Sequence, residues 1–220
     1  MQICQEPDKK KNMDKSTQKH RKINNSSILW SFYHEVHRYL KDAGVKRHLD
    51  IGHGKDLKFP RMMAARFHDI EIGYYDNSDI IMRLLNRIMS SNEAVYENLK
   101  YISSLEGEFD SASYFFTIHH FPSPLETLRE IYGHLKNEGI AIIIDYDLNW
   151  LRQEQNAKSV IKDILNSANE KKVMKTEQDW FEAHTKYSLE QCVKDAKEAG
   201  FHERVREVQE RKLFLYIGEK

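Results

Sequence analysis

The stretch HLDIGHGKD, residues 48 to 56, has the residue types of a ligand-binding turn. Gly52 and Gly54 follow a short apolar run, and glycines at such a turn let the backbone approach a ligand that a β-carbon would exclude. Asp76 stands about two dozen residues later, where a doubly wound fold places a carboxylate beside a ribose. The spacing favours a nucleotide-like ligand. The alternative is a purely steric role for the glycines and a helix-capping role for Asp76 with Asn77.

Side chains that can move protons follow the later apolar runs. His119 and His120 stand at the expected end of a fourth strand, Asp145 ends a fifth, and His184 belongs to a segment expected to cover the site. Imidazole accepts protons near pH 7, so His120 or His184 is the favoured base, with a structural role for His120 as the alternative. A metal set of these four residues is disfavoured, because adjacent histidines on one strand point to opposite faces. We expect no metal.

The elements that must position these residues alternate along the chain. Five apolar runs read as strands, with amphipathic helical patterns before and between them, which predicts a parallel sheet covered on both faces. Two closing runs separated by a short charged turn read as an antiparallel hairpin. The expected strands are 47–52, 70–76, 98–103, 109–118 and 140–147, with the hairpin at 203–210 and 212–219. The expected helices are 27–43, 58–67, 78–91, 123–139 closed by Gly139, and 188–200 closed by Gly200.

Composition limits the partners and the compartment. Lys+Arg and Asp+Glu are both 34, so no strong nucleic-acid signal exists beyond the basic tail that residues 1–26 form, which we expect to be disordered. Residues 27–220 suit one domain, with 150–187 as a helical insertion or lid over the site. No apolar run reaches membrane-spanning length. Two cysteines without a disulfide pattern indicate a cytoplasmic protein.

The stretch from Phe109 to Asp147 resembles the class I S-adenosylmethionine-dependent methyltransferases, especially the broad small-molecule, type 11-like family. The motifs in order are Phe109-Asp110, His119-His120, Pro122 and Pro124, Leu135-Lys136 through Gly139, and Asp145. The resemblance covers about residues 28–149 and returns in YSLEQCVKDAKEAGF and the hairpin. It implies a doubly wound, seven-stranded, mostly parallel sheet with an antiparallel C-terminal hairpin, the Rossmann-like methyltransferase fold. It also implies S-adenosylmethionine as cofactor and methyl transfer to an unidentified small-molecule or macromolecular acceptor.

The resemblance also implies a set of cofactor-binding residues. They are Asp50, Gly52, His53 and Gly54 in the first loop, Asp76 and Asn77 after the second strand, Ser104 and Leu105 after the third, and Tyr114 in the fourth. Two features depart from the family pattern: Asp56 replaces the third glycine of the loop, and the usual adenine-binding acid after the third strand is missing. These departures motivate the alternative of a catalytically degenerate binding or regulatory subunit with the same fold.

Overall fold

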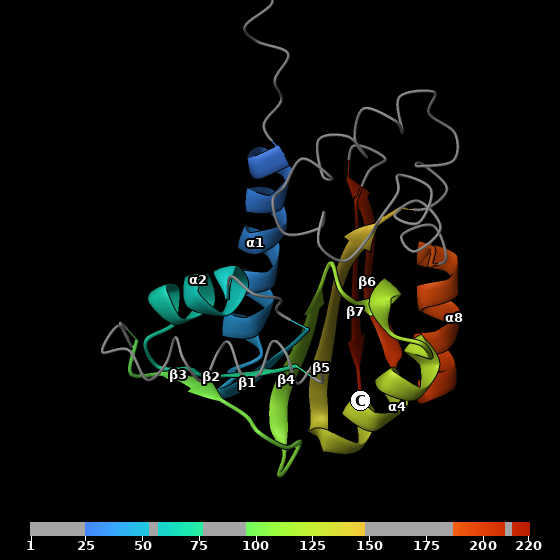
Figure 1. Cartoon of the computed structure of the whole chain (residues 1–220). Coiled ribbons are helices and arrows are strands. Elements are labelled where there is room, and N and C mark those ends of the chain that lie inside the picture. The colour runs from blue at the N-terminus through green and yellow to red at the C-terminus, as the bar shows by residue number, and fades with distance from the viewer. Residues whose placement is uncertain (1–24, 53–56, 77–95, 148–186, 210–212) are drawn as a thin grey trace, which may run out of the picture.

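The computed structural model describes residues 25–52, 57–76, 96–147, 187–209 and 213–220 (Figure 1). The strands are β1 (Arg47–Ile51), β2 (Glu71–Tyr75), β3 (Leu99–Tyr101), β4 (Phe109–Phe115), β5 (Leu135–Tyr146), β6 (His202–Gln209) and β7 (Leu213–Glu219). The helices are α1 (Asn25–Asp42), α2 (Lys58–Arg66), α4 (Pro124–His134) and α8 (Leu189–Ala199), with a 3₁₀ turn, η2, at Ile118–His120. Among the described residues, no helix combines the length and apolarity needed to cross a membrane.

The strands form one sheet in the order β3-β2-β1-β4-β5-β7-β6. All pairs from β3 to β5 are parallel, whereas β7 pairs antiparallel with both β5 and β6. Parallel neighbours require crossover connections, which place helices on both faces of the sheet. The predicted doubly wound sheet of seven strands and its closing hairpin are confirmed.

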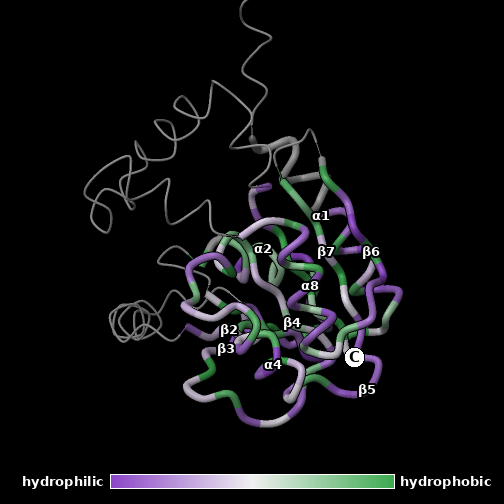
Figure 2. Tube along the Cα trace, turned by 90° about the vertical axis from the view of Figure 1, so that its right-hand side faces the viewer, coloured by the Kyte–Doolittle hydropathy of each residue, from purple (hydrophilic) through white to green (hydrophobic). Residues whose placement is uncertain are grey.

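Two apolar layers hold the helices to the sheet. In β5, Ile142 and Ile144 belong to the cluster that includes α1 and α2 residues, while Ala141 and Ile143 belong to the cluster beneath α4 and α8. This alternation follows from the two-residue period of a strand. Figure 1 shows the two helix pairs on opposite sides of the sheet, and Figure 2 shows that β6, at the sheet edge, is mainly hydrophilic.

Local capping residues fix ends of α4 and α8, two helices that pack against the sheet. The Ser123 side chain accepts a hydrogen bond from the Glu126 amide at the start of α4, and Ser188 does the same for Gln191 at the start of α8. Gly200 ends α8 in the left-handed conformation at φ 110°, as the sequence predicts. Serine caps and a terminal glycine therefore set these boundaries from local sequence alone.

The predicted closure of α4 by Gly139 is wrong. The helix ends at His134, because Leu135 is buried and pairs with Phe109 of β4. After that pair the register shifts, and pairing resumes between Ile140 and Ser111. Tertiary packing of Leu135 thus stops the helix before Gly139 is reached, and Gly139 lies within β5.

The predicted fourth strand is also too long. It ends at Phe115, because Phe116 adopts a left-handed backbone at φ 54° that an extended strand does not allow. The chain then enters the 3₁₀ turn at Ile118–His120, so the two histidines do not lie on a strand. Their side chains are consequently not directed to opposite faces, and the ring centroids of His119 and His120 lie 4.1 Å apart.

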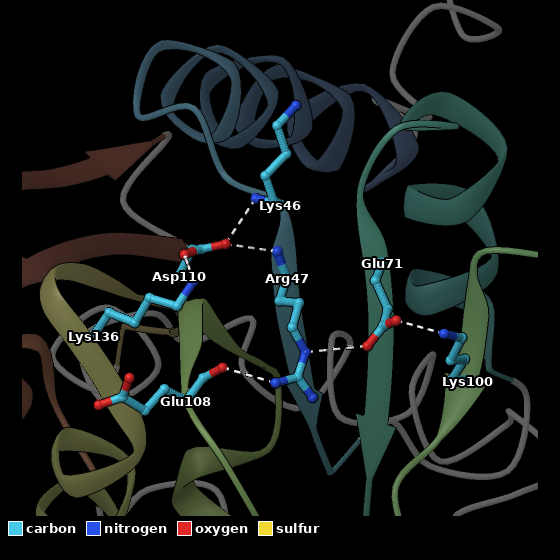
Figure 3. A network of polar contacts seen from close by, with 7 residues as sticks. All are labelled: Lys46, Arg47, Glu71, Lys100, Glu108, Asp110 and Lys136. Carbon is cyan, nitrogen blue, oxygen red and sulfur yellow. Dashed lines mark hydrogen bonds and ion pairs between the residues drawn. The ribbon is translucent and has the colours of Figure 1, made fainter.

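Charged side chains tie the strands together at the amino end of the sheet (Figure 3). Asp110 accepts hydrogen bonds from the backbone amides of Lys46 and Arg47 at 2.8 and 2.7 Å, and from Lys136 Nζ at 2.6 Å. Glu71 pairs with Arg47 on one side and Lys100 on the other. These six residues, together with Glu108, whose carbonyl accepts a hydrogen bond from Arg47, form what we call the amino-end network. The network holds the amino ends of β1 and β4 together and links β1, β2 and β3 side by side.

Several predictions concern residues outside the described ranges. They are the tail up to residue 24, the helix at 78–91 and nearly all of the insertion at 150–187. The first described helix starts at Asn25, so it includes the last two residues of the stretch predicted as tail. The tail, the helix at 78–91 and the insertion therefore remain predictions.

Candidate functional site

The carboxyl ends of β1 and β4 form the switch point of the sheet, where the strand order reverses direction. Ligands of open α/β sheets bind outside this point. Gly52 follows β1 with φ 71°, and its amide donates to the Tyr75 carbonyl at 2.9 Å. A β-carbon on Gly52 would lie 2.1 Å from Thr117 Oγ1, so the glycine is required for the close approach of the chain after β4. The absence of a side chain at Gly52 is thus explained by packing within the protein.

Two buried carboxylates lie at the carboxyl ends of neighbouring strands. Asp50 on β1 is 1% exposed and Asp76 after β2 is 7% exposed. Asp50 Oδ1 accepts a hydrogen bond from Ser113 Oγ at 2.8 Å, whereas Oδ2 has no hydrogen-bond partner among the described residues. Burial, with a smaller effect of the Asp76 charge, raises the pKa of Asp50 to about 8, although the Ser113 hydrogen bond opposes this rise. The two acidic groups thus oppose each other's ionisation in a region from which water is excluded.

Asp50 is the end of a chain of buried polar side chains. Ser113 Oγ lies 2.9 Å from His48 Nε2, and His48 Nδ1 lies 2.7 Å from Ser111 Oγ. His48, Ser111 and Ser113 are all fully buried. Burial lowers the pKa of His48 to about 3, so its imidazole is neutral at physiological pH.

An apolar cavity of about 330 Å³ opens beside this edge, on the α4 side of the sheet. Ile51 ends β1, Tyr75 ends β2, and Leu105 follows β3, so three neighbouring strands contribute to it. The remaining lining residues come from β4, from the segment between η2 and α4, and from α4 itself; they are Tyr114, Phe121, Pro122, Ser123, Glu126, Thr127, Glu130 and Ile131. Its volume and aromatic walls suit a flat heteroaromatic ring.

Some of the predicted binding residues line this cavity, and others do not. Leu105 and Tyr114 line it, and the Tyr114 hydroxyl points to the Thr127 carbonyl at 3.4 Å. Ser104 is not among the lining residues; it is exposed and donates to Glu106 at 2.8 Å. Sequence reasoning missed Tyr75 and Phe121. Their signal is positional, because Tyr75 immediately precedes Asp76 and Phe121 immediately follows the two histidines.

The histidines of η2 have different environments. His119 Nδ1 lies 2.6 Å from Asp145 Oδ2, and both side chains are buried. His120 packs its ring against His119 and is exposed on its other side. Desolvation, followed by the neighbouring His119, lowers the pKa of His120 to about 4, so His120 is neutral at pH 7. Asp145 therefore fixes His119, while His120 is the more accessible imidazole.

The remaining candidate residues lie outside the described ranges. They are His53, Gly54, Asn77 and His184, together with Asp56, which replaces the third glycine. Among the described residues, no group of three or more potential metal ligands comes together. The described part of the site therefore consists of two carboxylates, a neutral histidine chain, an apolar cavity and the η2 histidines.

This arrangement suits a ligand with a cationic part and an aromatic part. The buried carboxylates favour positive charge or hydroxyl donors, and the adjacent cavity favours a ring that stacks on Tyr75 or Phe121. Both features lie at one edge of the sheet, on the ends of adjoining strands. A ligand that spans them would lie across the switch point.

Comparison with known proteins agrees with this geometry. A family model described as a methyltransferase domain matches residues 24–202 of the chain. None of the proteins with curated descriptions matches the sequence.

Solved structures show the same fold at low sequence identity. A SAM-dependent methyltransferase from Aquifex aeolicus superposes with a TM-score of 0.56 at 16% identity, over 83% of this chain and 88% of that one. An O-methyltransferase family protein from Burkholderia thailandensis gives a TM-score of 0.57 at 12% identity, over 80% of this chain and 51% of that one. PigF with SAH gives 0.58 at 17% identity, over 81% and 51%. The chain thus spans about half the length of the latter two proteins.

Proposed function

The chain belongs to the methyltransferase domain family, and from this premise we propose that it transfers a methyl group from S-adenosylmethionine to an acceptor. The single observation that carries the choice of cofactor is the buried Asp50–Asp76 pair beside an apolar cavity. S-adenosylmethionine has a sulfonium and an ammonium group, a ribose with two hydroxyls, and an adenine ring. Three of these parts, the ammonium group, the ribose and the adenine ring, have chemically suited residues at the carboxyl edge.

The described residues fit the cofactor in three places. Asp76 is suited to accept hydrogen bonds from the ribose hydroxyls, and the Oδ2 atom of Asp50 is a buried acceptor for the ammonium group. Adenine fits the cavity walled by Tyr75, Leu105 and Phe121. In this assignment the cavity binds the adenine ring, which in the family is usually bound by an acidic residue after the third strand.

The protein itself needs to perform little covalent chemistry in methyl transfer. When bound, the cofactor supplies a methyl group on a positively charged sulfur, and transfer is an in-line displacement that removes this charge. The residues of the chain must align the reactants and exclude water, which the closely packed Gly52–Thr117 contact favours at the floor of the site. No nucleophilic side chain is required.

His120 is our candidate base for an acceptor that must lose a proton. It is neutral at pH 7 and exposed, whereas His119 is buried and held by Asp145. His184, the second candidate, lies outside the described residues. Replacing His120 by Gln is expected to lower the rate of S-adenosylhomocysteine formation with a proton-losing acceptor, without changing cofactor affinity. An unchanged rate would remove His120 from the mechanism.

Calorimetric titration with S-adenosylhomocysteine tests the proposed cofactor. The wild-type protein should bind, and Asp76→Asn should weaken binding by about 100-fold, because two hydrogen bonds to a charged acceptor are weakened. Glu71→Gln is the matched control, since Glu71 lies at the opposite end of the same strand. If the wild-type protein fails to bind at millimolar concentration, the degenerate binding or regulatory subunit becomes the better interpretation.

The compartment and the acceptor class are extensions of this proposal. A free, buried thiol at Cys192 supports a reducing cytoplasmic location, which cell fractionation would test. Balanced charge, with 34 basic and 34 acidic residues, supports an acceptor that does not need a large basic surface. Salt-independent methylation of a small acceptor would agree with this, and activity confined to RNA would contradict it.

A further inference from the structure

The two central strands carry three polar side chains where a doubly covered parallel sheet is normally apolar. His48, Ser111 and Ser113 are fully buried and lie on the face that packs against α1 and α2. Their neighbours Leu49 and Ala112 belong to the apolar cluster on the opposite face. Burying hydroxyls and an imidazole has a cost in stability unless each group is hydrogen-bonded. All three groups are hydrogen-bonded, and their hydrogen bonds form one chain that ends at Asp50.

Proton counting fixes the direction of these hydrogen bonds. The Ser113 hydroxyl has one proton and donates it to Asp50 Oδ1, so Ser113 Oγ must accept from His48 Nε2–H. The neutral imidazole then has an unprotonated Nδ1, which accepts from the Ser111 hydroxyl. All three groups thus donate in the same direction, and the chain Ser111–His48–Ser113 ends on the carboxyl group of Asp50.

The second oxygen of Asp50 lacks such support. Oδ2 is buried and has no hydrogen-bond partner among the described residues. The titratable groups that interact with Asp50 from other elements are Tyr33 on α1 and Asp76 after β2. The pKa of Tyr33 is raised to about 12 by burial and by Asp50, so its hydroxyl is neutral. Among the described residues, the titratable groups that interact electrostatically with Asp50 are therefore a neutral hydroxyl and a second acid, and neither is a cation.

We propose that His48 is a positioning residue, which holds the Ser113 hydroxyl on Asp50, and that the cofactor's ammonium group binds Asp50 Oδ2 and releases one proton. The inference depends on the proposed function, because it requires a cofactor with an ammonium group. In this step the O–H bond of the Asp50 carboxyl breaks, its proton passes to solvent, and a carboxylate–ammonium ion pair forms. No electron transfer is involved.

The pH dependence follows from the pKa of about 8 at Asp50 before binding. At lower pH the carboxyl is protonated and must lose its proton before it can pair with the ammonium group. Proton release at pH 6.5 should therefore approach one per molecule bound. Between about pH 5.5 and pH 7.5, the dissociation constant should rise about tenfold for each unit by which the pH falls.

Titration calorimetry in buffers of different ionisation enthalpy measures this proton directly. S-adenosylhomocysteine, which has the ammonium group, should release about one proton at pH 6.5. 5′-Methylthioadenosine lacks the amino-acid end and should bind without proton release. Equal proton release by the two compounds would overturn the assignment of the ammonium group to Asp50.

Variants of the polar chain test the role of His48. Ser113→Ala and His48→Leu should raise the pH at which binding becomes strong and weaken binding at pH 7 by about tenfold, because a donor to the charged carboxylate is lost. His48→Gln can still donate to Ser113 and should restore most of the affinity. Ser111→Ala, at the far end of the chain, should have the smallest effect.

A purely structural role of His48 predicts a different result. In that case His48→Leu and Ser113→Ala would lower the melting temperature without shifting the pH dependence of binding, which would overturn the proposal. If His48→Leu does not fold, Ser113→Ala and His48→Gln still decide the question. Binding of S-adenosylhomocysteine without proton release contradicts this inference alone, whereas no binding at any pH contradicts the proposed function as well.

Discussion

The two ends of the sheet use charge in opposite ways. At the amino end, Asp110 and Glu71 have cationic or amide partners for their oxygens, and the side chains lie partly in solvent. At the carboxyl end, Asp50 and Asp76 are more deeply buried, and each raises the energetic cost of charge on the other. The amino end therefore stabilises the fold, whereas the carboxyl end holds two acidic groups whose ionisation is unfavourable unless a cationic ligand is present.

The pKa values express the same contrast. Burial acts on both Asp110 and Asp50 in the direction that raises the pKa. Hydrogen bonds from Lys136 and two backbone amides nevertheless leave the pKa of Asp110 below its usual value. At Asp50 the single Ser113 hydroxyl does not offset burial, and the pKa rises to about 8. The number of donors, rather than burial alone, separates a structural carboxylate from a candidate binding group.

The largest stability effect is expected at Asp50. Its raised pKa means that the unfolded chain loses this proton before the folded protein does, so wild-type stability should fall as the pH rises from about 4 to about 8. Asp50→Asn removes the charge and should raise the free energy of unfolding at pH 8 by on the order of 3 kcal/mol. Urea denaturation at pH 4, 6 and 8 measures this. An Asp50→Asn variant that is less stable at every pH would contradict the contrast between the two ends.

A smaller effect of opposite sign is expected at Asp110. Because its pKa is lowered in the folded protein, its contribution is present above the unfolded value and disappears as the pH falls through the folded value. Asp110→Asn should lower the free energy of unfolding at pH 7 by about 2 kcal/mol. Binding of S-adenosylhomocysteine should not change. Asp69→Asn, which removes an exposed partner of Lys46, is the control and should have little effect on stability.

The smallest effect is expected at Glu71. Its carboxylate pairs with Lys100 and Arg47, but all three side chains are partly exposed, so solvent and salt screen the interaction. Glu71→Gln should lower the free energy of unfolding by less than about 1 kcal/mol, and the difference should vanish in about 1 M salt. A larger, salt-insensitive effect would mean that the amino-end network is more strongly coupled than its exposure indicates.

Local signals predicted the frame of the fold better than its details. Helical patterns identified α4 and α8, Gly200 identified the end of α8, and the apolar runs identified the strands, because these signals act within a few residues. The predicted end of α4 was wrong because Leu135 pairs with Phe109 of β4, a residue distant in sequence. The predicted end of β4 was wrong because Phe116 has a left-handed backbone, a conformation that a glycine would have signalled in the sequence but a phenylalanine does not.

The candidate site shows the same division. Motif spacing placed Asp50, Gly52 and Asp76 at or just after the ends of strands, as the structure does, while their roles in binding stay predictions. The chain from Ser111 through His48 to Ser113 was missed, since it depends on the register between β1 and β4, where His48 pairs with Ser111. Tyr75 and Phe121 were missed because an aromatic residue in a strand or turn is equally consistent with the core. Pairing across strands, rather than order along them, decides these contacts.

The outermost strands of the sheet have a consequence for behaviour at high concentration. β3 is only three residues long, and β6 presents exposed charged side chains, among them Glu203, Arg204, Arg206 and Glu207. A foreign strand that docked on either border would find too few backbone groups or would have to bury charge. The short β3 and the charged β6 thus protect the sheet against edge-to-edge aggregation at both borders.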